Sequence, residues 1–145
     1  MTDTMNDLFL VAHIGGRTVA IASADVESVV DIGDVMPVPR APAAVVGLAA
    51  LRSRVVTVID TRRALGLAGQ GAARRAVIVR AEGHHYAMMV DALEDVVPLR
   101  LQPVANGLAL DPAWRAITLG LVERDGEPVP AIDLAGLVPA LSAAA

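Results

Sequence analysis

The stretch PRAPAAVVGLAALRSRVVTVIDTRRALGL, residues 39–67, decides the fold. Its prolines predict an extended loop, because proline cannot donate the backbone hydrogen bond that a central strand needs. Two Val-rich runs follow, Val45–Leu51 and Val55–Asp60, with the polar reversal Arg52-Ser53-Arg54 between them. This pattern predicts a β-hairpin. The segment Thr61–Leu67 then predicts a short helix.

The same pattern returns near the C-terminus as ITLGLVERDGEPVPAIDLAGLV, residues 117–138. Gly47-Leu48 corresponds to Gly120-Leu121. Val58-Ile59-Asp60 corresponds to Ala131-Ile132-Asp133 at the same sequence offset. The second copy reverses at an Asp-Gly pair, which is typical of a tight hairpin.

An earlier pair of segments repeats as well. Val26–Val30 resembles Leu93–Val97. The strands expected before them, Val19–Ile21 and Tyr86–Met88, match at the same offset as these two segments. Both copies keep their elements in the same order, so the chain is built twice from one β unit. Two copies predict a paired domain rather than a solenoid, which stacks many repeats.

We expect one domain over residues 1–145, because a chain of this length can bury a core of its own. Within it, lobe A covers about residues 15–70 and lobe B about residues 76–133, separated by the small residues of AGQGAA. The N-terminal strand and the C-terminal helix are expected to pack across both lobes. The other expected elements are strands at Leu8–Ile14, Thr18–Ala22, Glu27–Ile32, Ala76–Ala81, His85–Val90, Glu94–Leu99, Ile117–Glu123 and Pro128–Asp133, a loop at Arg100–Arg115 and a helix at Leu134–Leu141.

The composition favours strands. Hydrophobic residues make up 54% of the chain but only three residues are aromatic, so the core is built from Val, Leu, Ile and Ala. Val-rich runs favour strands over helices, and we therefore predict an all-β fold with short helices. We expect Trp114, the only tryptophan, to anchor the core or a loop.

The charge and the missing residue types exclude several classes of protein. The net charge of −4 argues against nucleic-acid binding, which needs a basic face. The chain has no cysteine and therefore neither disulfides nor thiolate metal sites. It has no run of about 18 uncharged apolar residues, and its N-terminus lacks the basic region of a signal peptide. We expect a cytoplasmic protein with no direct membrane insertion.

No group of residues predicts catalysis, a cofactor or a metal site. Asp60 and Asp133 end corresponding strands and could act as paired acids, but each stands where a helix N-cap belongs. His84 and His85 are adjacent and face opposite sides of a strand, and no second cluster of ligands accompanies them or His13. The glycines lack the spacing of a phosphate loop. We therefore assign no catalytic, cofactor or metal residue and do not expect an enzyme.

The order of strand, proline loop, V-x-G-L-x-x-L-R, turn, V-V-x-V-I-D and short helix resembles the CheW family of chemotaxis coupling proteins. The resemblance covers nearly the whole chain and depends on order and spacing rather than on any one residue. The residues that carry it are Val26, Pro39, Pro42, Val45, Gly47, Leu51, Arg52, Val58, Ile59, Asp60, Arg62, Leu65, Gly66, Val90-Asp91, Gly120, Asp125-Gly126 and Ile132-Asp133.

The resemblance implies two intertwined five-stranded SH3-like barrels around a shared apolar core. It implies a non-enzymatic adaptor that couples the cytoplasmic tips of chemoreceptors to a CheA-type histidine kinase, with recruitment to membrane-associated receptor arrays. The kinase would be bound through its own CheW-like regulatory domain. The positions that correspond to the family's receptor or kinase contacts are Val26, Ser28, Gly47 and Arg52.

Two arginines are the strongest candidates for partner contacts, because a planar guanidinium pairs bidentately and stacks. Arg52 would project from its hairpin to a partner's carboxylate or carbonyl; the alternative is a solvated turn residue. Arg62 would belong to the same surface, or it would only pair with Asp60 or cap its helix. The full set of predicted partner-binding residues is Arg52, Gly47, Val26, Ser28, Ala50, Leu51 and Arg62.

Several positions near this surface depart from the family's pattern. The family usually has Asn-Leu-Arg-Gly where this chain has Ala50-Leu51-Arg52-Ser53, and it commonly has Glu at Ser28. Glu27 lies next to Ser28, but neighbours in a strand face opposite sides. These departures fit a specialised coupling protein as well as an ordinary one. The alternative is a regulatory module of the same fold, which binds another protein or holds a small ligand in the groove between the lobes.

Overall fold

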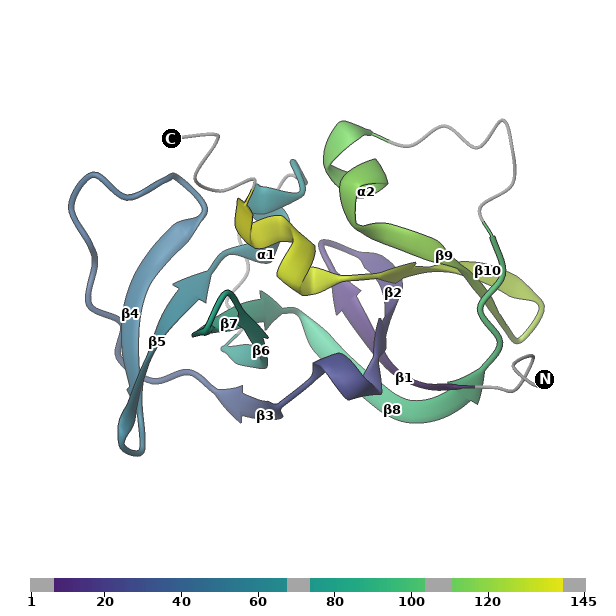
Figure 1. Ribbon diagram of the computed structural model, residues 1–145, viewed down its shortest axis with the longest axis horizontal. Helices are drawn as coiled ribbons and strands as arrows, with labels where there is room; N and C mark the ends of the chain where they lie inside the picture. The colour runs from purple at the N-terminus through teal and green to yellow at the C-terminus, as the bar shows by residue number, and fades with distance from the viewer. Residues whose placement is uncertain (1–6, 68–73, 104–110, 140–145) are drawn as a thin grey trace.

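The structure, a computed structural model, describes residues 7–67, 74–103 and 111–139 (Figure 1). Strands dominate these ranges and form two five-stranded sheets, so the predicted all-β fold is confirmed. The strands are β1 (Asp7–Ile14), β2 (Arg17–Ala22), β3 (Ser28–Asp31), β4 (Val45–Leu51), β5 (Arg54–Ile59), β6 (Arg75–Ala81), β7 (His84–Val90), β8 (Ala92–Leu99), β9 (Thr118–Arg124) and β10 (Glu127–Ile132).

The helical elements are short. They are the α-helices α1 (Thr61–Ala64) and α2 (Pro112–Ile117) and the 3₁₀ turns η1 (Ser23–Asp25) and η2 (Leu134–Gly136). None of the helices in the described ranges has the length and hydropathy needed to cross a membrane.

Each sheet contains strands from both copies of the repeat. One sheet has the order β3-β6-β7-β5-β4 and is called the β4 barrel below. The other has the order β8-β1-β2-β10-β9 and is called the β9 barrel. One copy of the repeat contains β1 to β5 and the other contains β6 to β10. In the β4 barrel, β6 and β7 lie between β3 and the hairpin of β5 and β4. In the β9 barrel, β1 and β2 lie between β8 and the hairpin of β10 and β9. The two barrels are therefore intertwined.

This arrangement differs from the expected lobes, which divided the chain into the continuous segments 15–70 and 76–133. Strands β1 and β2 belong to the sheet of β8, β9 and β10, whereas β6 and β7 belong to the sheet of β3, β4 and β5. The physical reason is the parallel pairing of β2 with β10 and of β7 with β5, which joins the two copies within each sheet.

The strand registers confirm the duplication that the sequence predicted. Ala131 pairs with Ala20 in the β9 barrel, and Val58 pairs with Ala87 in the β4 barrel. Ala131 is the repeat equivalent of Val58, and Ala20 is the repeat equivalent of Ala87. A register shift on β4 leaves out Val46, and the shift between β9 and β10 leaves out its repeat equivalent, Leu119.

The barrels share one apolar core in addition to a smaller core inside each. Successive residues of a strand face opposite sides, so Val77 of β6 enters the shared core while Ile78 enters the interior of the β4 barrel. Trp114 on α2 is 3% exposed and packs in the shared core, as does Leu134 of η2. The prediction that Trp114 is an anchor is therefore confirmed.

The segment expected to be a loop at Arg100–Arg115 contains the start of α2. The Asp111-Pro112 pair marks that start, because proline suits the first position of a helix, where its missing N–H is not needed. The C-terminal helix expected at Leu134–Leu141 begins as η2 and remains helical to residue 139. Its expected end and the AGQGAA boundary lie outside the described residues.

Two glycines allow a loop to cross close over each barrel's outer hairpin. Met36 exchanges two backbone hydrogen bonds of 2.8 Å with Leu48 of β4, and Gln102 makes the same pairing with β9. A Cβ atom at Gly47 would overlap the carbonyl oxygen of Met36, and one at Gly120 would overlap that of Gln102. Glycine is therefore needed at both positions for the close backbone approach.

We predict that Gly47→Ala and Gly120→Ala each lower the free energy of unfolding by about 1–3 kcal/mol, because the crossing loop must move away. Urea denaturation measures the loss. Gly33→Ala is the matched control, since an added Cβ there meets nothing within 4 Å. Its effect should stay below about 0.5 kcal/mol, and equal losses in all three variants would contradict the explanation.

Candidate functional site

A hollow of about 530 Å³ lies at the open side of the β4 barrel. Strand β3 forms one wall with Ser28–Asp31, and the tip of the β4–β5 hairpin forms the other with Ala50–Arg54. The buried residues Val56 and Ile78 form the floor. Because β3 and β4 are the two ends of the sheet order, the hollow marks the place where strand pairing does not close the barrel.

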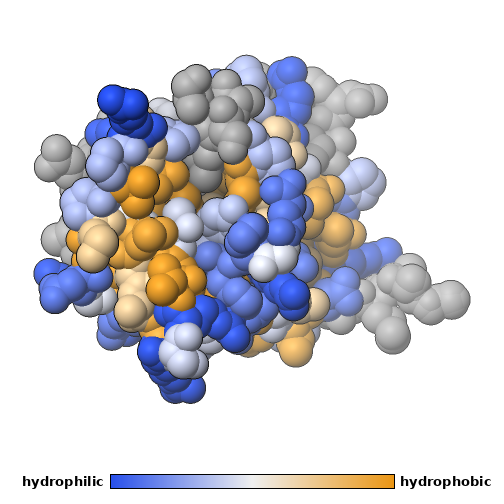
Figure 2. Space-filling model, turned by 60° about the vertical axis from the view of Figure 1, so that its left-hand side comes forward, coloured by the Kyte–Doolittle hydropathy of each residue, from blue (hydrophilic) through white to orange (hydrophobic). Residues whose placement is uncertain are grey.

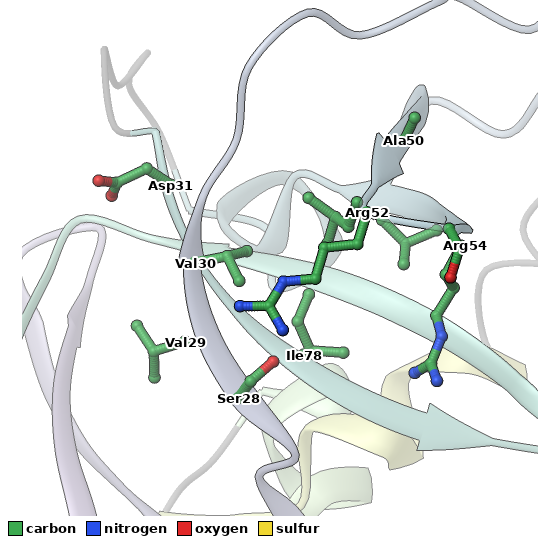
Figure 3. Close-up of a pocket in the computed structure, with 11 residues that line it drawn as sticks. Ser28, Val29, Val30, Asp31, Ala50, Arg52, Arg54 and Ile78 are labelled. Atoms are coloured by element: carbon green, nitrogen blue, oxygen red, sulfur yellow. The ribbon is translucent and has the colours of Figure 1, made fainter.

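Arg52 extends over this hollow. It begins the turn between β4 and β5 with a φ of 58°, a left-handed conformation that costs a non-glycine residue about 1–2 kcal/mol. Figure 3 shows its side chain reaching across the hollow toward Ser28, with Ile78 close by. Within the described residues, no hydrogen bond or ion pair engages its guanidinium. Its N–H donors are therefore available to an external acceptor.

The acidic side chains beside the hollow already form ion pairs and hydrogen bonds with other residues of the β4 barrel. Glu27, just before β3, lies 3.5 Å from Nη1 of Arg54 and forms a 3.1 Å hydrogen bond with Nε2 of His85. Asp31 accepts a 3.2 Å hydrogen bond from Nε of Arg75. These exposed pairs contribute little stability. The basic partners offset the negative charges of Glu27 and Asp31 next to the hollow. Arg52 therefore remains as the charged side chain at the hollow without a counter-charge in these pairs.

Side chains bridge the corresponding opening of the β9 barrel. Glu94 on β8 is the repeat equivalent of Glu27, and it binds both Arg124 on β9 and His13 on β1. Arg124 is the repeat equivalent of Leu51 on β4. Leucine cannot form this bridge, and at the opening between β3 and β4 Glu27 pairs instead with Arg54, at the edge of the hollow. The duplicated unit thus places the ion pair differently in the two barrels, and the β4 barrel keeps a hollow beside it.

The structure brings four of the seven predicted partner-binding residues together. Val26 does not join them, because it is half-buried and packs against the shared core. Gly47 is buried where the loop crosses β4, and the close approach there explains its identity. The four residues that line the hollow are Ser28, Ala50, Leu51 and Arg52.

Arg62 lies apart from the hollow in an internal network. Its Nε and Nη2 both donate to Oδ1 of Asp91 at 3.1 Å, and Oδ2 of Asp91 accepts the backbone N–H of Gly15 at 2.7 Å. The two charged side chains are only 15% and 28% exposed. The alternative that Arg62 pairs with Asp60 is wrong. Arg62 instead ties α1 to the start of β8 and to the β1–β2 turn, and a partner contact through it stays a prediction.

The two acids considered as a catalytic pair take different structural positions. Asp60 accepts the backbone N–H of Arg63 at 3.2 Å and caps α1, as predicted. Asp133 also stands at the N-cap position, before η2, but its side chain makes no cap hydrogen bond there. Burial raises the pKa of Asp25, and the nearby Asp133 carboxylate raises it further. In the part of the chain that the structure describes, no three His, Cys, Asp or Glu side chains are placed to hold a metal.

Sequence reasoning missed most of the β3 wall, Val29–Asp31, and the floor residue Ile78. One signal was present in the repeat. Val29 and Val96 occupy the same position in the two copies, and both remain exposed in spite of their apolar side chains. Exposed apolar residues of this kind mark surfaces that bind other molecules when they gather in one place.

The bridge in the β9 barrel makes stability depend on pH. Hydrogen bonds from Arg124 and then His13 hold the pKa of Glu94 below its ordinary value of 4.5. A lowered pKa means that the folded state favours the charged form. The stabilisation is therefore complete at neutral pH and is lost as the pH falls below the ordinary value through the lowered one.

We predict that Glu94→Gln lowers the Tm at pH 7 and has little effect once the pH lies below the lowered pKa. Thermal melts across this range measure the difference. Glu123→Gln on the same barrel is the control, since Glu123 is exposed and forms no ion pair within the described residues. A loss of Tm that does not change with pH would contradict the bridge.

Known proteins share this architecture. One family model, described as a CheW-like domain, matches residues 8–142. No curated protein sequence matches the chain. Among solved structures, the chain is similar to the crystal structure of the scaffolding protein TtCheW from Thermoanaerobacter tengcongensis, with a TM-score of 0.80 and 24% identity over 92% of each chain.

Proposed function

Because the chain belongs to the CheW-like domain family, we propose that it is a non-enzymatic adaptor that couples chemoreceptors to a CheA-type histidine kinase. The observation that carries the proposal is the open hollow of the β4 barrel with the unengaged Arg52 above it. This role places the protein in the cytoplasm, where membrane-associated receptor arrays recruit it.

The hollow fits a protein segment better than a charged small molecule. Its floor is apolar at Val56 and Ile78, and its walls mix apolar and polar side chains in about equal share. Arg52 lies at its rim and forms no ion pair within the described residues. Such a surface suits a partner that inserts an apolar side chain and presents a carboxylate or carbonyl oxygen to Arg52. We assign this contact to the regulatory domain of the kinase and the receptor tip to a second surface of the same chain.

The mechanism of such an adaptor is geometric. The two barrels share a packed core, and packed interiors transmit displacement instead of absorbing it. A receptor and a kinase bound to one rigid body therefore have coupled orientations. Moderate affinity at each surface is sufficient in an array, because each bound neighbour raises the effective concentration of the next.

The small-ligand alternative has one observation in its favour, the volume of the hollow. At about 530 Å³ it lies within the range of ligand pockets, roughly 300–1,000 Å³. The expected ligand position between the lobes is occupied by side chains of the shared core. A ligand in the hollow of the β4 barrel would compete with the kinase for Arg52.

We predict that the purified chain binds the regulatory domain of a CheA-type kinase with micromolar or tighter affinity. Arg52→Glu should weaken this binding by at least about tenfold, because it places a like charge against the partner's acceptor. Titration calorimetry measures the affinity, and thermal melting checks that the variant remains folded.

Arg63→Glu is the matched control, since Arg63 is exposed on α1 and does not line the hollow. Binding lost equally in both variants would contradict the assignment of the hollow. No binding to the regulatory domain, together with saturable binding of a small metabolite that Arg52→Glu removes, would favour the ligand-binding alternative.

A further inference from the structure

One acidic side chain at the edge of the hollow is shared by two basic side chains. Glu27 lies 3.5 Å from Nη1 of Arg54 and 3.1 Å from Nε2 of His85. We call these three residues the Glu27 trio. Arginine stays charged in proteins, whereas histidine gains or loses its charge in the physiological pH range. The total charge of the Glu27 trio therefore depends on pH.

Protonation of His85 adds one positive charge beside the hollow. While His85 is neutral, the negative charge of Glu27 balances the positive charge of Arg54, and the Glu27 trio has no net charge. Once His85 is protonated, one carboxylate faces two cations, and the net charge of the trio is positive. Arg54 lines the hollow together with Arg52. A fall in pH thus makes the hollow more positive, and a rise in pH makes it less so.

The surroundings of His85 let this change of charge act on the hollow. Arg80 on β6 is the cross-strand partner of His85, and Arg54 on β5 shares Glu27 with it. Glu27 is the acid that contacts His85 in the part of the chain that the structure describes. The His85 side chain is only 18% exposed, and salt screens a partly buried charge less than an exposed one.

The β9 barrel contains the same combination of side chains. Glu94, the repeat equivalent of Glu27, binds Arg124 and also His13. His13 lies on β1, the first strand of its copy, whereas His85 lies on β7, the second strand of the other copy. Two of the chain's three histidines thus contact the two equivalent glutamates, and the one in the β4 barrel does so at the edge of the hollow.

We propose that His85 makes the hollow a pH-dependent docking site: protonation of His85 strengthens the binding of an acidic partner, and loss of the proton weakens it. The inference rests on the proposed function and names a regulation of the same hollow. Figure 2, which brings the β4-barrel side forward, shows hydrophilic side chains beside apolar ones on this side of the molecule. The apolar part of a contact there does not change with pH, so the charge of the Glu27 trio sets the change in affinity.

Two adjacent histidines provide the test variant and its control. His85→Gln cannot be protonated, but its amide N–H can still donate a hydrogen bond to Glu27. His84→Gln is the control, because His84 is exposed and neighbours in a strand face opposite sides. A third variant, Glu27→Gln, removes the negative charge and makes the trio positive even while His85 is neutral.

Titration calorimetry with the regulatory domain of a CheA-type kinase, at about pH 5.5 and about pH 8, covers the range in which histidine titrates. From the higher to the lower pH, the wild-type chain should gain at least about threefold more affinity than His85→Gln does, because one unit charge several Å from an acid contributes this much even in water. This comparison cancels the titration of the kinase's own groups. Glu27→Gln should bind more tightly than the wild type at the higher pH by a similar factor.

A His85→Gln variant with the same pH dependence as the wild type would overturn the proposal, as would a His84→Gln variant that loses as much of it. Binding by the wild type that does not change with pH would overturn this inference alone. Absence of binding at both pH values would overturn the proposed function and this inference with it. Thermal melts at both pH values check that the variants are folded, and the gain expected for Glu27→Gln cannot arise from a failure to fold.

Discussion

The structure depends on two parallel strand pairings, β2 with β10 and β7 with β5. They place the first two strands of each repeat copy inside the sheet of the other copy, so neither copy can form a barrel alone. Breaking either pairing would leave buried backbone groups without partners, which is costly in an interior without water. The shared core, with Val77 from one barrel and Leu10 from the other, reinforces the same constraint.

This exchange of strands between the two repeat copies also explains why the two ends of the molecule can differ. It fixes the third strands and the outer hairpins as the edges of the two barrels, and edges are the parts of a sheet free to meet other molecules. Glu94 and Arg124 bridge the opening of the β9 barrel, whereas in the β4 barrel Leu51 and Arg52 line a hollow beside the Glu27–Arg54 pair. Duplication of one unit, followed by different changes at the edges of the two barrels, thus produces a single rigid body with two unlike surfaces.

Local elements could be predicted from the sequence, but their pairing could not. The hairpin strand Val45–Leu51 was predicted to the residue, because alternation and turn residues act over short distances. Internal resemblance shows which segments are alike, not which ones lie together. The family resemblance implied two intertwined five-stranded barrels, which is confirmed, but the repeat itself led to the wrong division into continuous lobes. Arg62 illustrates the same limit, because its partner Asp91 is distant in sequence while the expected partner Asp60 lies close by. The β3 wall and the floor of the hollow likewise meet only through the pairing of β3 with β6.

Native-state hydrogen exchange in increasing denaturant tests the exchange of strands most directly. Ile21 and Met88 are equivalent residues on β2 and β7 and lie in different sheets. The account predicts that their amides open with the same free energy, equal to that of global unfolding, because neither sheet can open without the other. A lower opening free energy for one of them, while the other remains protected, would contradict it and show that the barrels unfold as separate units.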